Sequence, residues 1–328
     1  MPESARKAEQ AVEAPEADPA FRADVLAGLA APVPAVPARW LYDRRGSELF
    51  EAITGLPEYY PTRTEMALLE AHCRQVAQIA GTGDAVIEFG SGSSAKTPIL
   101  LDAVDPSAYV PIDISGDFLR ESAAALQERF PGLPIIPVEA DFMRPISLPQ
   151  ALGGATKLGF FPGSTIGNMV PRTAVDLLRA MKETLGSGAW LLIGMDRIKP
   201  VERLLAAYDD AEGVTAQFNL NLLHRINAEL GGNVDIEAWR HRAIWNDQRA
   251  RIEMHLEAVR DNAFSVAGQA FSFRAGETIH TENSHKYGER EARLLLLAAG
   301  WGVVRQWTDA QDQFAILLAQ AEAPRFAP

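Results

Sequence analysis

The chain has 328 residues, of which 47% are hydrophobic and 23% charged, and its formal net charge is −12. This balance is typical of a globular protein and excludes a disordered or fibrous chain. Because the negative net charge would repel a polyanion and no run of Lys and Arg offsets it, we do not expect nucleic acid as a partner.

Residues 1–20 are rich in Ala, Glu and Pro, a composition that predicts a disordered leader. They lack the apolar segment of a signal peptide. No stretch approaches the roughly 20 apolar residues that a membrane-spanning helix needs. The only cysteine, Cys73, excludes an intrachain disulfide and a zinc site built from cysteines. We therefore expect a cytoplasmic monomer with no membrane partner.

The first predicted elements are helices. A short helix over 46–53 is ended by Pro57, and apolar residues at helical spacing predict a long helix over 61–79. Short apolar runs then alternate with helical patterns, which predicts a parallel sheet covered on both faces. The strands are expected at 84–89, 108–114, 135–139, 157–161 and 189–195, and the helices between them at 97–104, 118–130 and 171–185.

The alternation of strands and helices breaks near residue 200 and resumes near residue 288. Residues 201–246 have a helical pattern, whereas 251–273 alternates apolar and polar residues as a hairpin or meander would. A last helix is expected at 290–299, followed by an antiparallel hairpin of two strands at 301–308 and 313–320.

These patterns predict an α/β fold with two domains. A doubly wound, Rossmann-like domain comprises 61–199 plus 287–325, and a second, smaller α+β domain comprises 20–60 plus 200–286. A cleft between two domains is the expected place for a ligand.

The first strand of the sheet ends in the turn Glu88-Phe-Gly-Ser-Gly-Ser-Ser94. Gly90 and Gly92 let the backbone approach a ligand closely at a strand-to-helix turn. The turn alone also fits a dinucleotide-binding loop or a plain tight turn, so its neighbours have to decide between these interpretations.

Acidic residues beside this turn and at the next strand ends favour an adenosyl ligand. Asp113 can accept hydrogen bonds from both ribose hydroxyls, and Asp141 can meet the adenine amino group with Phe142 against the ring. Glu88 would repel a pyrophosphate but suits the cationic groups of S-adenosylmethionine, whose carboxylate Lys96 can reach. We therefore predict S-adenosylmethionine as the cofactor.

Three alternatives to this interpretation stay open. Each acid, and Lys96, could be an ordinary solvated residue. A nicotinamide-dependent oxidoreductase would share the fold, although Glu88 and the terminal hairpin speak against it. A non-catalytic sensor of an adenosyl ligand would keep the cofactor site without turnover.

The fourth strand leads into a second glycine-containing loop, 160–169. Ligands of doubly wound sheets lie beyond the carboxyl ends of the strands, so this loop faces the reactive end of the cofactor. Gly163 brings the backbone close, and the amide of Asn168 can orient a substrate amine. The competing interpretation makes Asn168 the cap of the helix that Pro171 begins.

Six blocks of the sequence resemble the histidine-specific N-alpha-methyltransferases of ergothioneine biosynthesis, a family of class I S-adenosylmethionine-dependent methyltransferases. The blocks are 56–65, 88–97, 161–168, 207–210, 218–219 and 281–284. The resemblance implies L-histidine as the substrate and its N-alpha-trimethylated form, hercynine, as the product. Another aromatic amino acid, such as tryptophan or tyrosine, is the nearest alternative substrate.

The resemblance also implies roles for individual residues. Glu282 and Ser284 hold the imidazole, and Met254 lines its pocket. The backbone of the amino acid is fixed by Asn168, by Tyr208 and by one of two adjacent tyrosines, Tyr60 being preferred over Tyr59. Tyr42 closes over the amine. A half-buried core role competes for every tyrosine.

The sequence indicates neither a dedicated base nor a metal site. No His–Asp pair stands out as a base, so desolvation of the ammonium is expected to lower its pKa, with water or a tyrosine passing the proton on. The six histidines include no His-x-x-x-His pair, and His280 and His285 are expected to be ordinary polar residues rather than ligands.

Overall fold

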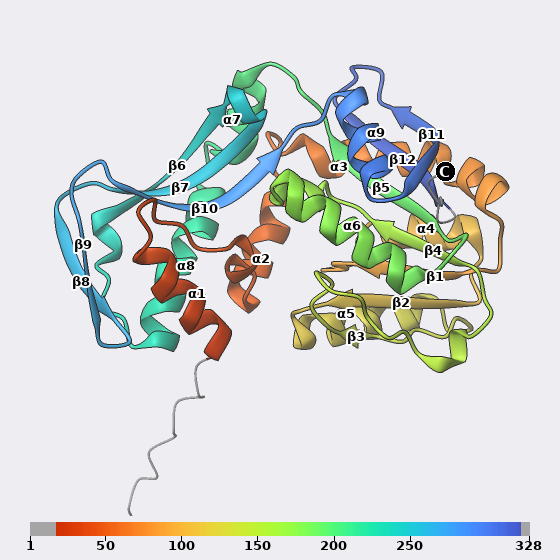
Figure 1. Ribbon diagram of the computed structural model, residues 1–328, viewed down its shortest axis with the longest axis horizontal. Helices are drawn as coiled ribbons and strands as arrows, with labels where there is room; N and C mark the ends of the chain where they lie inside the picture. Colours follow the sequence, from red (N-terminus) through yellow and green to blue (C-terminus); the bar gives the residue numbers. More distant parts are fainter. Residues whose placement is uncertain (1–17, 323–328) are drawn as a thin grey trace, which may run out of the picture.

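The computed structural model of the protein describes residues 18–322 (Figure 1). The predicted leader therefore lies almost wholly outside the described residues. Its end is wrong, because helix α1 (Pro19–Leu29) begins within it, with the Asp18 carboxylate accepting a hydrogen bond from the Ala20 backbone N–H at 2.8 Å. An N-cap Asp followed by Pro is a helix-start signal that could have predicted α1.

A seven-stranded sheet with strand order β11-β12-β5-β4-β1-β2-β3 forms the larger part of the molecule, called here the large lobe. Strands β1 to β5 are parallel, and β12 runs antiparallel to both of its neighbours. The α/β prediction is thus confirmed, with a third strand shorter than expected. The strands are β1 (Ala85–Phe89), β2 (Ala108–Asp113), β3 (Val138–Glu139), β4 (Lys157–Phe161), β5 (Trp190–Asp196), β11 (Trp301–Thr308) and β12 (Phe314–Ala321).

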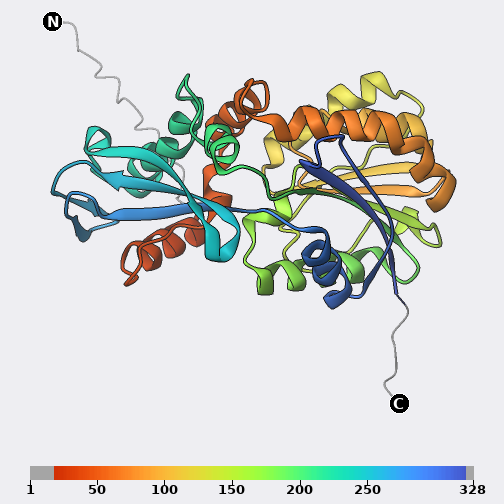
Figure 2. The same cartoon turned by 90° about the horizontal axis from the view of Figure 1, so that it is seen from above.

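Helices cover both faces of this sheet (Figure 2). Each face packs its own hydrophobic core, because strands buried on both sides expose apolar residues in both directions. One face carries α3 (Tyr60–Ala80), α4 (Thr97–Val104) and α5 (Gly116–Arg129), and the other carries α6 (Pro171–Leu185) and α9 (Glu289–Ala298).

The remaining elements form a small lobe with a separate core. A three-stranded antiparallel sheet, in the order β10-β7-β6, packs against helices there, and β8 and β9 form a hairpin. The elements are α1, α2 (Arg44–Thr54), α7 (Val201–Tyr208), α8 (Val214–Leu230), β6 (Trp239–Asn246), β7 (Arg251–Ala258), β8 (Asn262–Val266), β9 (Gln269–Phe273) and β10 (Thr278–His285). Short 3₁₀ helices occur at η1 (Ala38–Leu41), η2 (Gln150–Leu152), η3 (Thr165–Asn168), η4 (Ile236–Ala238) and η5 (Asp247–Arg249).

Two predictions for the small lobe are wrong. The helical pattern expected as far as residue 246 ends with α8, and β6 follows it. Strand β10 was not expected at all, although it carries Glu282 and Ser284. Among residues 18–322, every helix is too short or too polar to cross a bilayer.

The chain passes between the lobes at three places, after α2, after β5 and after β10. The last two crossings run side by side, because the Tyr287 backbone N–H donates to the Asp196 carbonyl at 2.8 Å. The ends of β5 and β10 are thereby fixed together beside the space between the lobes.

Candidate active site between the lobes

A cavity of about 760 Å³ lies between the two lobes. Its large-lobe wall is formed by the glycine turn after β1, the end of β2 and the loop 162–173, and its small-lobe wall by residues 35–39, by α2 and by β10. This volume suits a small-molecule ligand of nucleoside size.

The glycine turn has a backbone conformation that favours glycine. Gly90 and Gly92 have φ of +71° and +50°, a region that glycine enters without strain. The Gly92 and Ser115 backbone N–H groups each donate to the Asp113 carboxylate at 3.0 Å. Phe142 lies against the turn, since a Cβ added to Gly90 would come within 3.4 Å of its ring.

Glu88 is buried beneath this turn. Its Oε2 accepts hydrogen bonds from the Thr97 and Tyr109 hydroxyls, each at 2.6 Å. Burial raises the pKa of Glu88 to about 7, and the two hydrogen bonds oppose that shift. The buried Ser91 hydroxyl, which also lines the cavity, has no hydrogen-bond partner among the described residues. The turn therefore presents polar groups that a bound ligand can satisfy.

Lys96 also lines the cavity, but it has a carboxylate partner that the sequence reasoning missed. Its Nζ lies 2.5 Å from Glu65 Oε2, and the same carboxylate accepts the Gly163 backbone N–H at 2.8 Å. Glu65 is fully buried. It precedes Leu69 by one helical turn on the apolar stripe of α3, and a carboxylate in that position needs partners. That signal could have identified Glu65 as the link between the two loops.

Asp141 lies at the rim of the site rather than in its wall. Its carboxylate is 42% exposed and 3.6 Å from the Arg39 guanidinium. The neighbouring Phe142 does line the cavity, as does Arg39. The contact between Asp141 and an adenine amino group stays a prediction.

The cavity continues into a narrower pocket inside the small lobe. The two share the side chains of Tyr42, Tyr59, Asn168 and Glu282, which form the junction. The inner end is closed by residues from four different elements of the small lobe, namely Tyr208, Thr215, Phe218, Met254 and Ser284. The Thr215 hydroxyl is buried without a partner among the described residues. Tyr208, Met254 and Ser284, which only the family resemblance connected in the sequence, thus line one pocket.

Two polar pairs mark this pocket. The Tyr42 hydroxyl donates to Glu282 Oε2 at 3.4 Å, and burial raises the pKa of Glu282 to about 7. Deeper in the pocket, the Tyr208 and Ser284 hydroxyls lie 2.6 Å apart, and Lys286 Nζ donates to both. The sequence reasoning missed Lys286, whose signal would have been its position two residues after Ser284, directly beyond the end of β10 and in line with the period of two of a strand.

The structure reverses the preference between the two adjacent tyrosines. Tyr60 is fully buried and donates its hydroxyl to Asp196 Oδ2 at 2.6 Å, away from the pocket. Tyr59 lines both the cavity and the pocket. The one-residue difference matters because Tyr60 begins α3, whereas Tyr59 is the residue before it.

Asn168 ends η3 at the junction of cavity and pocket. The capping interpretation is wrong, because the N-cap of α6 is Val170 and no side chain caps that helix. The amide of Asn168 is therefore placed where a ligand in the pocket would meet one in the cavity.

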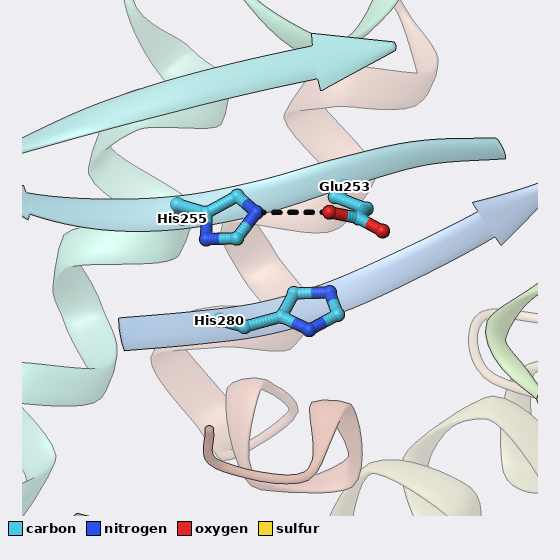
Figure 3. Close-up of side chains that lie close together, drawn as sticks. All are labelled: Glu253, His255 and His280. Atoms are coloured by element: carbon cyan, nitrogen blue, oxygen red, sulfur yellow. Dashed lines mark hydrogen bonds and ion pairs between the residues drawn. The ribbon is translucent and has the colours of Figure 1, made fainter. Parts of the chain in front are cut away.

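A cluster of Glu253, His255 and His280 lies on β7 and β10 (Figure 3). His255 Nε2 is 3.3 Å from Glu253 Oε2, and the two imidazole rings stack with centroids 4.8 Å apart and planes 18° apart. Each imidazole already has a partner within the protein, because His255 Nε2 lies beside the Glu253 carboxylate and His280 Nε2 is 3.0 Å from the Glu282 carbonyl oxygen. Since Arg251 also forms an ion pair with Glu253, we interpret the cluster as a polar network around that carboxylate, on the side of β7 opposite Met254.

Comparison with known proteins gives a consistent set of relatives. A family model described as "Histidine-specific methyltransferase, SAM-dependent" matches residues 21–321. A histidine N-alpha-methyltransferase of Mycolicibacterium smegmatis is 40% identical over 92% of this chain and 94% of its own length. One from Mycobacterium tuberculosis is 41% identical over the same shares. Ergothioneine biosynthesis protein 1 of Neurospora crassa is 30% identical over 87% of this chain, which corresponds to 33% of that longer protein.

Proposed function

The chain belongs to the family of histidine-specific, S-adenosylmethionine-dependent methyltransferases, and from this premise we propose that it methylates the α-amino nitrogen of L-histidine. The names of its relatives support methylation of histidine at the α-nitrogen and a place in ergothioneine biosynthesis. We propose the N-alpha-trimethylated form as the product. The observation that carries the proposal is the pocket in which Glu282, Ser284 and Tyr208 close off a space that opens at Asn168 onto the larger cavity.

The residues around the larger cavity fit S-adenosylmethionine. The Gly90–Gly92 turn allows close approach, Asp113 can accept hydrogen bonds from ribose hydroxyls, and the unpartnered Ser91 hydroxyl can bond a polar group of the cofactor. Glu88 places negative charge beneath a cationic molecule. When bound, the sulfonium supplies an electrophilic methyl group.

The residues of the inner pocket then have to hold the α-amino nitrogen in line and free of its proton. Burial raises the pKa of Tyr42 and Tyr59 well above the usual value, so both stay protonated and neither serves as a base. We assign deprotonation to desolvation of the ammonium, with the proton leaving to water. The neutral amide of Asn168 then orients the lone pair through every round of methylation.

Mass spectrometry with each of the twenty amino acids and S-adenosylmethionine tests the proposed function. We expect histidine to gain mono-, di- and trimethylated products, with other amino acids reacting at least tenfold more slowly, because their side chains place no N–H group opposite Glu282. Preferential methylation of tryptophan or tyrosine would contradict histidine as the substrate but would leave the proposed methyl transfer in place. A lack of any methylated product from a folded protein that binds the cofactor would refute catalysis.

Asp113→Ala is expected to weaken S-adenosylmethionine binding by about tenfold to 100-fold, because charge-assisted hydrogen bonds to the ribose are worth roughly 1.5–3 kcal/mol. Titration calorimetry measures the affinity. Asp117→Ala, an exposed acid of the following helix, is the matched control and should bind normally. Equal affinity of folded Asp113→Ala and wild type would remove Asp113 from the cofactor site.

The cytoplasmic location, the monomeric state and the lack of nucleic-acid or membrane partners stay predictions.

A further inference from the structure

Lys286 is a cation next to the pocket, and its side chain is fully buried. Its ammonium group has three hydrogen-bond donors, and three acceptors surround it: Asp196 Oδ2 at 2.7 Å, Ser284 Oγ at 2.7 Å and Tyr208 Oη at 2.9 Å. All three donors are thus used within the protein. Lys286 therefore acts on any ligand through the hydroxyls of Ser284 and Tyr208 rather than by direct contact.

Asp196 anchors this lysine at the place where the lobes join. Its carboxylate also accepts hydrogen bonds from Lys199 at 2.5 Å and from Tyr60 at 2.6 Å. Burial opposes ionisation, but Lys286 and Lys199 outweigh it and hold the pKa of Asp196 below its usual value. These four residues lie at or directly beside the ends of elements at all three crossings between the lobes, so the position of Lys286 is set by both lobes.

The hydroxyls of Ser284 and Tyr208 together have two O–H donors and four acceptor lone pairs. Ser284 Oγ and Tyr208 Oη each accept one hydrogen bond from Lys286. They also lie 2.6 Å apart, so one of the two O–H groups is spent between them. Whichever way that bond runs, one O–H group remains for a ligand, and the oxygen that carries it already accepts two hydrogen bonds. The other oxygen keeps one lone pair, but the Lys286 ammonium beside it disfavours a second positively charged donor, so the pair faces a ligand chiefly with its free O–H group.

We propose that Lys286, held by Asp196, is a positioning residue that makes the Ser284–Tyr208 pair a hydrogen-bond donor, so that the pocket selects a ring with an unprotonated nitrogen. The inference rests on the proposed function and deepens it. Glu282, on the same strand, is an acceptor, so the pocket pairs one acceptor with one donor. That combination matches neutral imidazole, which has one N–H and one bare nitrogen. It suits imidazolium poorly, because the buried charge of Lys286 repels a second cation there, and an all-carbon ring has no atom that can accept the O–H.

A double-mutant cycle tests the role of Lys286. Histidine affinity is measured by calorimetry, in the presence of S-adenosylhomocysteine, for wild type, Lys286→Met, Ser284→Ala and the double variant. Each single change is expected to weaken binding by about tenfold. The double variant should be little weaker than either single one, because both changes remove the same oriented hydrogen bond. Losses that multiply would overturn the proposal, since they would mean that Lys286 acts on stability or closure instead.

Two controls separate orientation from a general loss of charge. Lys199→Met removes a buried cation from the same Asp196 without touching the hydroxyls, and Lys182→Met removes a partly buried lysine remote from the pocket. We expect the cycle between Lys199→Met and Ser284→Ala to be additive, and Lys182→Met to bind histidine as wild type does. Coupling of Lys199 to Ser284 as strong as that of Lys286 would assign the effect to charge and overturn the orienting role.

A ligand pair tests the same idea on the wild-type protein, whatever the folding of the variants. 3-(4-Thiazolyl)-L-alanine and 3-(3-thienyl)-L-alanine have similar five-membered rings, but only the first has a bare ring nitrogen, and neither has a ring N–H. We expect the thiazole to bind about tenfold more tightly. Equal affinity would overturn the donor assignment. Methylation of histidine by wild type is scored separately, so failure of the proposed function is distinguishable from failure of this inference.

Discussion

Replacing Asn168 with alanine is expected to lower kcat for histidine methylation by about 100-fold, with a much smaller change in S-adenosylmethionine affinity. Asn168 lies at the junction of cavity and pocket, where the amine and the methyl group have to meet. The reaction requires the nitrogen lone pair to be held in line with the bond that breaks, and loss of such positioning costs roughly two orders of magnitude in rate. Single-turnover kinetics with saturating cofactor measure the step directly.

A control variant has to separate loss of amine positioning from loss of protein stability. Asn233→Ala is the matched control, because that asparagine accepts a hydrogen bond from the Ser265 backbone N–H at 2.7 Å in the small lobe, outside the pocket. It should lose some thermal stability and keep its kcat. Asn168→Ala with the wild-type rate constant would show that the loop does not orient the amine, and Tyr42 or Tyr59 would then be the next candidates at the junction.

The sequence predicted the large lobe well, because its signals are local. Buried strands such as β1 read as uninterrupted apolar runs, and Gly90 and Gly92 mark the turn that follows. The strand ends then indicate which side chains share an edge of the sheet, so the neighbourhood of Asp113 and the turn followed from topology alone.

The small lobe was harder to predict because its elements depend on partners distant in sequence. Strand β6 lies at an edge of its sheet, and its eight residues are mostly half-buried, so it lacks the clean alternation of a strand with one solvated face. Strand β10 has a bulge between His280 and Glu282, which breaks its period. A carboxylate such as Glu282 could be assigned to a pocket only by resemblance, since its burial arises from residues of other elements.

Buried polar networks were the other gap. Glu65, Asp196 and Lys286 are ordinary charged residues in the sequence, and their positions in the helix or strand pattern do not reveal the partners that bury them. Each is stabilised by a partner more than 30 positions away, namely Lys96 for Glu65 and Asp196 for Lys286. Burial of a charge requires such a partner. The choice between Tyr59 and Tyr60 depended on the same network, because Asp196 binds the second of them.

Replacing Glu282 with alanine is expected to lower the ratio of kcat/KM for histidine to that for phenylalanine by about 100-fold at pH 8. Burial raises the pKa of Glu282 to about 7, so at pH 8 the carboxylate is ionised. Histidine should then lose a charge-assisted hydrogen bond of roughly 1.5–3 kcal/mol in the variant, a factor of about 10 to 100. Phenylalanine should gain, because in the wild-type protein its ring leaves that charge unpaired.

The pKa of Glu282 limits how much the kcat/KM for phenylalanine can rise in Glu282→Ala. The wild-type protein can neutralise the unpaired carboxylate by taking up a proton, which costs about 1.4 kcal/mol for each pH unit above the pKa. Discrimination against phenylalanine should therefore rise with pH above 7, by up to about tenfold per unit. The α-amino group titrates in both substrates, so its effect largely cancels in the ratio. Glu282→Ala should show no such rise.

The measurement is the ratio of kcat/KM for the two substrates, taken in wild type and variant between pH 6.5 and 9. Glu253→Ala is the matched control: Glu253 is an equally buried acid on the neighbouring strand but lies on the opposite side of the sheet from the pocket. It is expected to lower Tm and to leave the ratio and its pH dependence unchanged. If folded Glu282→Ala keeps the wild-type ratio at pH 8, Glu282 does not read the imidazole, and the assignment of the pocket to histidine fails. The cofactor site would be untouched by that result, because the glycine turn and Asp113 belong to the other lobe.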